Sequence, residues 1–206
     1  MNRLMSTRAD DDRDDLSDVA LLSRMAQGDD QQALQELYAR YRRPVWRYIW
    51  RLVNDDPNLA DEVTQDVFVA AWRQAATFRA EASPATWLFR IARHRAINAR
   101  RNLARRLEGH LWRGATGGED DAGTVDAGEP SHENAVIERL SLAEALGHLS
   151  AKHREALDLV FIYGFSLEET AQILDTPLGT VKSRLSYARR ALQDHLSAGE
   201  RLEETR

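Results

Sequence analysis

The chain has 206 residues, of which 43% are hydrophobic and 30% are charged, and its formal net charge at pH 7 is −5. It contains no cysteine, which excludes disulfides, thiolate metal sites and a cysteine nucleophile. No stretch approaches the roughly 18 consecutive apolar residues of a membrane span, and the polar N-terminus is unlike a signal peptide, so we expect a cytoplasmic protein without membrane insertion. Abundant Ala, Leu, Arg and Glu, with few β-branched residues, predict an all-α fold.

The charge is distributed unevenly along the chain. Residues 90–113 hold eight arginines and one glutamate, whereas residues 114–138 hold seven acids and neither Lys nor Arg. A polyanion responds to the local potential of a surface rather than to the total charge of the protein. The negative net charge is therefore compatible with a nucleic-acid partner.

The N-terminal part of the chain predicts a tail followed by two helices. Residues 1–15 contain five aspartates and three arginines with almost no apolar side chains, which is typical of a disordered tail. Apolar positions at helical spacing then predict a helix over residues 16–26. A second helix follows, capped by Asp29 or Asp30, and Pro44 is expected to interrupt or kink it.

A third helix is predicted to begin at the N-cap and first-turn pair Asp56 and Pro57 and to end near Ala75. It carries an acidic outer patch in its N-terminal half. Such a patch can be a binding surface, or it can be a solvated face on which the helix dipole favours acids. The residues of this acidic patch are Asp61, Glu62, Gln65 and Asp66.

A loop over residues 78–83 leads into a basic helix, which is predicted from Pro84 to about Arg106. Aromatic side chains that alternate with arginines can stack on unpaired bases and hold the neighbouring phosphates. In the alternative interpretation Trp87 is a core anchor and the arginines only solvate the helix. The arginines concerned are Arg90, Arg93, Arg100, Arg101, Arg105 and Arg106.

Glycine and acids dominate from about residue 108 to residue 130, where helical periodicity is lost. This composition predicts a flexible acidic linker between two domains. Beyond it, helices are predicted over residues 134–146 and from the cap Ser150 to Gly164, and they are expected to give the C-terminal domain a core of its own. The apolar residues that the latter helix is expected to contribute to this core are Leu157, Leu159, Val160, Phe161 and Ile162.

Residues 165–192 predict two short helices that meet at a tight turn. Ser166 and Glu169 have the spacing of a capping box, in which each side chain accepts a hydrogen bond from the backbone amide of the other residue. Pro177 ends the first helical pattern, and Thr176 is the expected N-cap of a second helix from about residue 178. The side chains of the first helix expected to face solvent are Glu168, Glu169 and Gln172.

The second helix presents a basic and hydroxylic outer face, and its inward residues are Val181, Leu185, Ala188 and Leu192. Two short helices of this kind fit a helix-turn-helix whose second helix enters a DNA major groove, where Lys and Arg reach phosphates or guanine edges. The alternative is an ordinary helical hairpin with a solvated basic face. The outward residues are Thr180, Lys182, Ser183, Arg184, Tyr187 and Arg189.

These features together resemble the extracytoplasmic-function (group IV) sigma factors of bacterial RNA polymerase, which belong to the sigma-70 family. The resemblance rests on three motifs in the order found in the family, with a linker between the second and the third. The motifs are DEVTQDVFVAAW (61–72), TWLFRIARHRAIN (86–98) and FSLEETAQILDTPLGTVKSRLSYARRAL (165–192).

The resemblance implies a division of the chain. Residues 16–107 would form a sigma region 2 domain that binds core polymerase and recognises and melts the minus-ten element. Residues 133–198 would form a sigma region 4 domain whose helix-turn-helix reads the minus-thirty-five element as duplex DNA. The acidic linker would occupy residues 108–132, and residues 199–206 would be a tail.

The resemblance also implies roles for individual side chains. The acidic patch would face the coiled coil of the largest polymerase subunit, and the loop over residues 79–83 would pocket a flipped base of the non-template strand. Two positions depart from the family pattern, because Asp175 stands where many relatives have glycine and His94 where asparagine is frequent. The implied minus-ten residues are Phe78, Arg79, Ser83, Trp87, Arg90, Arg93 and His94.

The expected function is that of a promoter-specificity sigma factor, with core RNA polymerase, promoter DNA and an anti-sigma factor as partners. The alternatives are a stand-alone helix-turn-helix regulator, which leaves the TWLFRIARHRAIN stretch without a role, and a helical scaffold, which would not need outward cations on a recognition helix. We expect no enzyme, metal or cofactor, because the six histidines show no metal-ligand spacing with carboxylates and no glycine-rich phosphate loop follows a strand.

Overall fold

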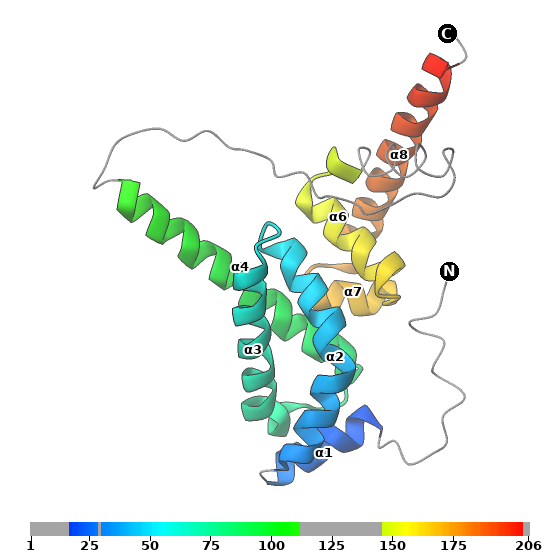
Figure 1. The fold of residues 1–206 in the computed structure, drawn as a ribbon. Coiled ribbons are helices and arrows are strands. Elements are labelled where there is room, and N and C mark those ends of the chain that lie inside the picture. Colours follow the sequence, from blue (N-terminus) through cyan, green and yellow to red (C-terminus); the bar gives the residue numbers. More distant parts are fainter. Residues whose placement is uncertain (1–16, 29, 112–145, 204–206) are drawn as a thin grey trace, which may run out of the picture.

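The computed structural model describes residues 17–28, 30–111 and 146–203, and within these ranges all regular structure is helical (Figure 1). The expected all-α fold is therefore confirmed for this part of the chain. The predicted linker, the N-terminal tail and the helix predicted over residues 134–146, apart from its last residue, lie outside it. The elements are α1 (Asp18–Gln27), α2 (Gln31–Leu52), α3 (Pro57–Gln74), the 3-10 turn η1 (Ala75–Thr77), α4 (Pro84–Leu111), α6 (Ala151–Leu157), the π-helical segment η2 (Asp158–Ile162), α7 (Leu167–Leu174) and α8 (Leu178–Glu203).

Side-chain caps fix the beginnings of the first three helices. The Ser17 hydroxyl accepts from the amide of Ala20 at 3.3 Å, and the Asp30 carboxylate accepts from the amide of Ala33 at 3.0 Å. Asp56 caps α3 in the predicted way, directly before the first-turn proline. Of the two caps considered for α2, Asp30 makes the bond, because it stands immediately before the first helical residue.

Of the two effects predicted for Pro44, the interruption does not occur, since α2 is helical from Gln31 to Leu52, and the kink stays a prediction. A proline inside a helix lacks the amide that would bond to the carbonyl four residues earlier. Tertiary packing offsets this loss here, because Val45, Tyr48 and Ile49 follow the proline directly and are all buried. Burial of the helical turn after Pro44 therefore outweighs the low helix propensity of proline.

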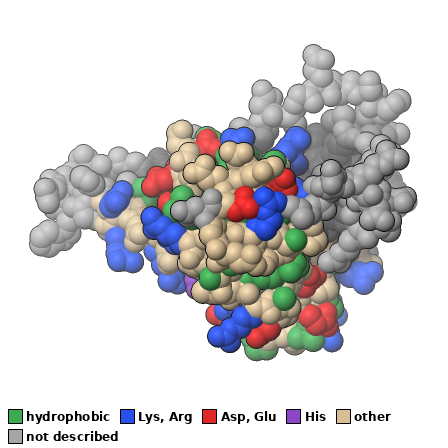
Figure 2. Space-filling model, turned by 90° about the horizontal axis from the view of Figure 1, so that it is seen from below, with side chains coloured by type: hydrophobic (Ala, Val, Ile, Leu, Met, Phe, Trp, Pro, Cys, Tyr) green, Lys and Arg blue, Asp and Glu red, His purple; other side chains and the backbone are tan. Residues whose placement is uncertain are grey.

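Helix α4 packs against α2 and α3 with its first half and then runs on beyond them (Figure 1). Its buried residues are Thr86, Leu88, Phe89, Ala92 and Ala96, whereas Arg100 and all residues from there to Arg106 are exposed. Figure 2 shows Lys and Arg side chains gathered at the end of the molecule toward which α4 runs. None of the described helices is long and apolar enough to cross a lipid bilayer.

The C-terminal elements form a helical unit built on contacts between α6 and α8 and between α7 and α8. Arg154 of α6 donates hydrogen bonds to the carbonyls of residues 146, 147 and 149 and so ties down the turn before the helix. Ser150 stands at the predicted N-cap position, but its hydroxyl pairs with the Nδ1 atom of His153 at 2.9 Å instead of with a backbone amide.

Phe161 and Ile162 correct a prediction, because both were expected in the core and are 74% and 52% exposed. The cause is η2, whose wider π-helical turn rotates the side chains that follow relative to the preceding α-helix. Leu159 is fully buried, and Tyr163 is 8% exposed and takes the inward position at the end of the segment. Gly164 then has φ 71, a left-handed conformation suited to glycine, as the predicted end of this helix requires.

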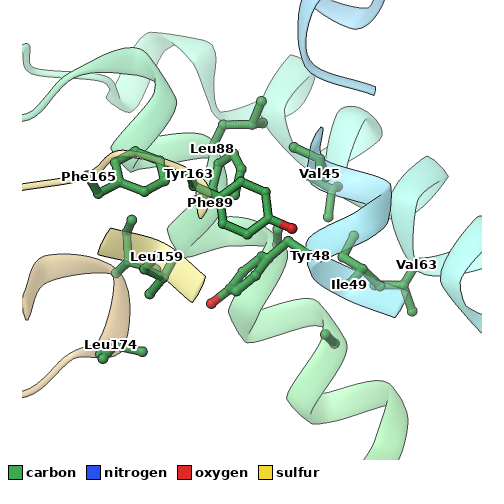
Figure 3. Packing of buried hydrophobic residues seen from close by; sticks show 14 of the residues in the cluster. Val45, Tyr48, Ile49, Val63, Leu88, Phe89, Leu159, Tyr163, Phe165 and Leu174 are labelled. Carbon is green, nitrogen blue, oxygen red and sulfur yellow. The ribbon is translucent and has the colours of Figure 1, made fainter. Parts of the chain in front are cut away.

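A single cluster of buried side chains joins the N-terminal and C-terminal helices (Figure 3). The ring of Phe89 in α4 lies 5.2 Å from that of Tyr48 in α2, 5.1 Å from Tyr163 and 4.9 Å from Phe165, measured between centroids. The pairs with Tyr163 and Phe165 are edge-to-face, and such pairs contribute about 0.5 to 1.5 kcal/mol each beyond the area that they bury. The C-terminal helices therefore share this core with α2 and α4, where a separate core had been expected.

Candidate nucleic-acid interface

The first helix of the predicted helix-turn-helix, α7, begins with the predicted capping box. The amide of Glu169 donates to the Ser166 hydroxyl at 3.1 Å, and the amide of Ser166 donates to the Glu169 carboxylate at 3.0 Å. Thr170, Ile173 and Leu174 are buried, which leaves Glu168 and Gln172 exposed as expected. Glu169 is only partly exposed, because its carboxylate also contacts the N-terminal half of the molecule.

The turn between α7 and α8 is made possible by Asp175. This residue adopts the left-handed conformation, with φ 50 and ψ 51. Glycine adopts that conformation without cost, and Asp and Asn tolerate it better than other residues do. The departure from the family's glycine therefore leaves the tight turn intact. The predicted cap is wrong, since the Thr176 hydroxyl is buried and makes no hydrogen bond.

The predicted basic and hydroxylic face of α8 lies on the surface. Lys182, Ser183 and Arg189 are exposed, while Thr180 and Arg184 are partly exposed. Apart from the Ser183 hydroxyl, which donates to the carbonyl of Thr180 at 2.9 Å, these side chains make no polar contact within the described ranges. The inward residues are as predicted, with Val181 and Ala188 fully buried.

Tyr187 is the most exposed aromatic residue of this face, at 59%. Its ring stacks on that of His153 in α6, with centroids 4.4 Å apart and an interplanar angle of 24°. The stacking fixes the ring against the body of the C-terminal unit and leaves one face outward. His153 was missed by sequence reasoning, because nothing in the local pattern of α6 points to a partner 34 positions later.

The acidic patch lies on the exposed face of α3. Asp61, Glu62, Gln65 and Asp66 are all exposed, and none of them makes a hydrogen bond or ion pair with another described residue. The positions between and around them, including Val63 and Val67, are buried. The patch is thus an uncompensated negative surface on a helix that the core holds in place.

The predicted minus-ten residues lie in the loop before α4 and along the first half of that helix. Phe78 packs edge-to-face against Trp87 with ring centroids 5.7 Å apart, and both are partly buried, so Trp87 is a core anchor that keeps one exposed side. Arg79, Arg90 and His94 are exposed. The loop itself is turned by Ala80, whose φ is 56.

Two residues of the same set, Ser83 and Arg93, contact acids of the C-terminal helices. The Ser83 hydroxyl donates to the Glu169 carboxylate at 3.0 Å, and the neighbouring Thr86 hydroxyl donates to the same oxygen at 3.1 Å. The Nε atom of Arg93 donates to the Oε1 atom of Glu155 at 2.8 Å. Sequence reasoning missed all these contacts, which join residues 62 to 86 positions apart.

The hydrogen bonds to Glu169 favour its ionised carboxylate. Burial alone would raise the pKa of Glu169, but hydrogen bonds from the Ser166 amide and from the Ser83 and Thr86 hydroxyls lower that pKa below its ordinary value. Glu169 therefore serves as a hydrogen-bond acceptor at neutral pH. The Glu155 carboxylate also accepts a hydrogen bond from the hydroxyl of Tyr48 at 2.9 Å. Burial and this carboxylate raise the pKa of Tyr48 well above its usual range, so its phenol remains a donor.

Comparison with known families assigns both halves of the chain. Residues 37–106 match the family described as Sigma-70 region 2, and residues 139–192 match Sigma-70, region 4. The sigma factor SigL of Mycobacterium tuberculosis is 37% identical over 161 residues, which cover 78% of this chain and 86% of SigL. The chain belongs to the extracytoplasmic-function sigma factors. Its function is to direct RNA polymerase to specific promoters, as the resemblance implied.

A second relative of this sigma factor spans even more of the chain. The sigma-E factor of Haemophilus influenzae is 33% identical over 187 residues, which cover 88% of this chain and 96% of the relative. The match thus includes both halves and the segment between them. A stand-alone helix-turn-helix regulator would match only the C-terminal half, so this alternative is not supported.

Two solved structures share the fold of this sigma factor. One is CnrH in complex with the cytosolic domain of CnrY, with a TM-score of 0.60, 26% identity and coverage of 88% of this chain and 97% of the other. The other is the sigma factor RpoE from Bartonella quintana in complex with the anti-sigma factor NepR, with a TM-score of 0.61, 26% identity and coverage of 79% and 96%.

Proposed function

We propose that this sigma factor divides its work between a region 2 domain over residues 16–107 and a region 4 domain over residues 133–198, joined by the acidic linker over residues 108–132. The first domain binds core polymerase and melts the minus-ten element. The second reads the minus-thirty-five element as a duplex. The matched ranges of the two families, residues 37–106 and 139–192, fall inside these boundaries and support them.

The observation that carries the minus-thirty-five assignment is the free basic face at the start of α8. Lys182 and Arg184 lie in its first two turns, directly after the tight turn, and neither has a partner within the described ranges. In a helix-turn-helix the N-terminal residues of the second helix contact base edges. Arg184 is our candidate for reading a base, and Thr180, Lys182, Ser183, Tyr187 and Arg189 are candidates for positioning contacts.

The minus-ten assignment rests on an exposed basic helix beside an aromatic pair. Single-stranded DNA is held by aromatic rings that stack on bases and by cations that follow the phosphates. Trp87, supported from behind by Phe78, can offer its exposed side to a base, and Arg90 and His94 are free at the surface beside it. The loop that contains Arg79 and Ser83 would receive the flipped base.

The polymerase contact is assigned to the acidic patch of α3. An exposed acidic surface without internal partners on a rigid helix complements a basic partner and steers its association. The contact residues are Asp61, Glu62, Gln65 and Asp66.

An anti-sigma factor is proposed as a further partner, because the RpoE that shares this fold was crystallised with the anti-sigma factor NepR. The protein acts in the cytoplasm, where core polymerase and the promoter are found. It is proposed to act without catalysis of its own, with neither metal nor cofactor, through binding alone.

Reconstituted transcription tests this function. The purified chain is added to core RNA polymerase, and run-off transcripts are measured on a library of promoter fragments. The expected result is transcription from a restricted set of fragments that depends on the added chain. A matched reaction uses the Asp66→Arg variant, which should retain the fold and lose the transcripts. Equal transcription with and without the chain would refute the proposal.

A further inference from the structure

Three of the outward side chains of α8 lie above one another along the helix. Thr180, Arg184 and Tyr187 are separated by four and three positions, the spacings that place side chains on the same helical face. Tyr187 lies about 4.5 Å beyond Arg184 along the axis, at 1.5 Å per residue. If Arg184 reads a base in the major groove, as proposed above, Tyr187 therefore faces the same groove near an adjacent base pair.

The Tyr187 side chain offers this groove a chemistry that the rest of the face lacks. Its neighbours on the face are cations and hydroxyls, whereas its ring is apolar and the residue is 59% exposed. In the major groove the one apolar group on a base edge is the C5-methyl of thymine, while the other three bases present hydrogen-bond donors and acceptors there. An aromatic ring at this place thus favours a thymine.

The ring is supported from behind, because α6 lies beside α8 (Figure 1). The imidazole of His153 stacks on it with the centroids 4.4 Å apart and an interplanar angle of 24°. The Nδ1 atom of His153 pairs in turn with the Ser150 hydroxyl at 2.9 Å. A series of contacts therefore runs from the N-cap position of α6 to the outward ring of α8.

This support limits the freedom of an exposed side chain before DNA is bound. A surface side chain samples several rotamers and loses them when a partner immobilises it, which weakens binding. The imidazole covers one face of the Tyr187 ring and leaves the other face outward, so the orientation of the ring is restricted in the free protein. Preorganisation of this kind strengthens a contact without adding a new one.

A second pair of rings joins the same parts of the chain at a different level. His148, in the turn before α6, lies 5.0 Å from His195 of α8 between ring centroids, with an interplanar angle of 45°. His195 is about 12 Å further along α8 than Tyr187, at 1.5 Å per residue. This pair is therefore remote from the start of α8, which is the part proposed to enter the groove, and it provides a matched comparison.

We propose that the Tyr187 ring reads the methyl group of one thymine in the minus-thirty-five element, and that His153 is a positioning residue that holds the ring for this contact. The inference rests on the proposed minus-thirty-five surface. It moves Tyr187 from the positioning contacts to the base-reading contacts and extends the surface from α8 onto the first turn of α6. The sequence preference of the sigma factor then depends in part on a residue outside the helix-turn-helix.

Removal of single methyl groups from the promoter tests the contact. Holoenzyme is assembled from the full chain and core RNA polymerase, and the promoter is the fragment that it transcribes best in the run-off assay. Each thymidine of the minus-thirty-five element, on either strand, is replaced in turn with deoxyuridine, which lacks only the C5-methyl. Competition binding at one fixed salt concentration should show a loss of about fourfold in affinity at one position, the size expected for one buried methyl group.

Variants at residue 187 assign the methyl effect to the ring. Tyr187→Ala should bring the ratio of thymine to uracil affinity at that position to about one, whereas Tyr187→Phe keeps the ring and should retain the ratio. Ser186→Ala changes the adjacent exposed residue of α8 and is the matched control, which should leave the ratio as in the wild type.

Variants at residue 153 test the positioning role. His153→Ala removes the stacked imidazole and should lower the ratio below about twofold, while His153→Phe restores a ring that stacks and should keep it. His148→Ala removes the ring that faces His195 and should leave the ratio unchanged. A residue that only supported the fold would weaken binding to the thymine and uracil fragments equally, so its loss would not change the ratio.

Each part of the proposal has an outcome that overturns it. A minus-thirty-five element without thymine, no position that is sensitive to uracil, or a ratio that survives in Tyr187→Ala would overturn the readout by Tyr187. A full ratio in His153→Ala, an equal loss in His148→Ala or no rescue by His153→Phe would overturn the positioning role of His153. Failure of the sigma function itself would show separately and earlier, as the absence of run-off transcripts that depend on the chain.

Discussion

The hydroxyl of Tyr48 in α2 donates a 2.9 Å hydrogen bond to the carboxylate of Glu155 in α6, across 107 positions of sequence. Tyr48 is 2% exposed and Glu155 is 9% exposed. The same carboxylate accepts from Arg93, so one acid of the C-terminal unit connects two helices of the N-terminal unit. This buried polar junction makes the two halves interdependent in stability.

Replacement of Tyr48 with Phe should lower the free energy of unfolding by about 1.5 to 3 kcal/mol, the usual range for a hydrogen bond to a charged group. Tyr163→Phe is the matched control, because Tyr163 lies in the same aromatic cluster and no hydrogen bond of its hydroxyl is found among the described residues. Urea denaturation should show the larger loss for Tyr48→Phe. Equal losses in the two variants would mean that the hydroxyl contributes nothing specific.

Arg184→Ala should weaken binding of the holoenzyme to its promoter by about 1 to 3 kcal/mol and relax the preferred sequence at one minus-thirty-five position, if Arg184 reads a base. If it contacts only phosphate, the loss should be uniform across sequences and the salt slope should fall by about one. Gln193→Ala, at an exposed site further along α8, is the control. Binding measured over a panel of promoters decides between the two roles, and no change in either quantity would exclude both.

Asp66→Arg should abolish competition for core polymerase while it changes the stability of the isolated chain by less than about 0.5 kcal/mol, because the side chain is exposed and unpaired. Glu62→Arg should have a weaker effect in the same direction. Asp194→Arg reverses a charge on α8 and should leave competition unchanged. A variant at residue 66 that melts like the wild type and still competes would show that the patch is only a solvated face.

The contribution of Glu169 to stability should depend on pH in a predictable direction. Its folded-state pKa lies below the ordinary value of 4.5, so the contribution is present above that value and is lost as the pH falls through the folded-state pKa. Burial raises the pKa of Asp158 despite the opposing ion pair with Arg51, so that carboxyl has the opposite effect.

The Tm difference between the wild type and Glu169→Gln should therefore narrow as the pH falls from about 6 to about 3. The contribution of Asp158 is the same in both proteins and cancels in this difference. Glu168→Gln removes a neighbouring charge that makes none of these hydrogen bonds, and its difference from the wild type should not narrow in this way. A constant difference for Glu169→Gln across the range would contradict the assignment.

The turn at Asp175 can be tested with two substitutions. Asp175→Gly should leave the free energy of unfolding unchanged or raise it by up to about 1 kcal/mol, since relief of the left-handed strain is partly offset by the greater freedom of the unfolded chain. Asp175→Ala should lower it by about 1 kcal/mol, because alanine tolerates that conformation poorly. Thermal melts of the two variants provide the comparison, and equal stability would mean that the turn does not require φ 50.

Features governed by neighbours in sequence were predictable. The capping box of Ser166 and Glu169, the Asp56 cap with its proline, and the inward positions Val181 and Ala188 follow from spacing alone, and all are confirmed. Helical periodicity likewise located the acidic patch and the basic face of α8 on the surface. These features depend on interactions within one or two helical turns.

Features governed by distant contacts were not predictable. The helical pattern assigned the carboxylate of Glu169 to solvent, because Ser83 and Thr86 lie more than 80 positions away. Phe89 was missed because its ring packs on residues distant in the sequence, which are Tyr48 of α2 and Tyr163 and Phe165 of the C-terminal unit. Phe161 was placed inward because a π-helical turn has no clear signature in sequence.

The last turns of α4 have a further consequence. The helix has 28 residues and is about 42 Å long at 1.5 Å per residue, yet side chains from Arg100 to Arg106 pack against no core. Of these described side chains, Arg100 alone is held, by a hydrogen bond that it donates to the carbonyl of Leu52 at 3.3 Å. A helix end that carries four arginines is destabilised by their mutual repulsion, which dissolved salt or a bound polyanion would reduce. Helix formation at this end is then coupled to the binding of anions. The helicity of the free protein should therefore rise with ionic strength in the absence of any partner.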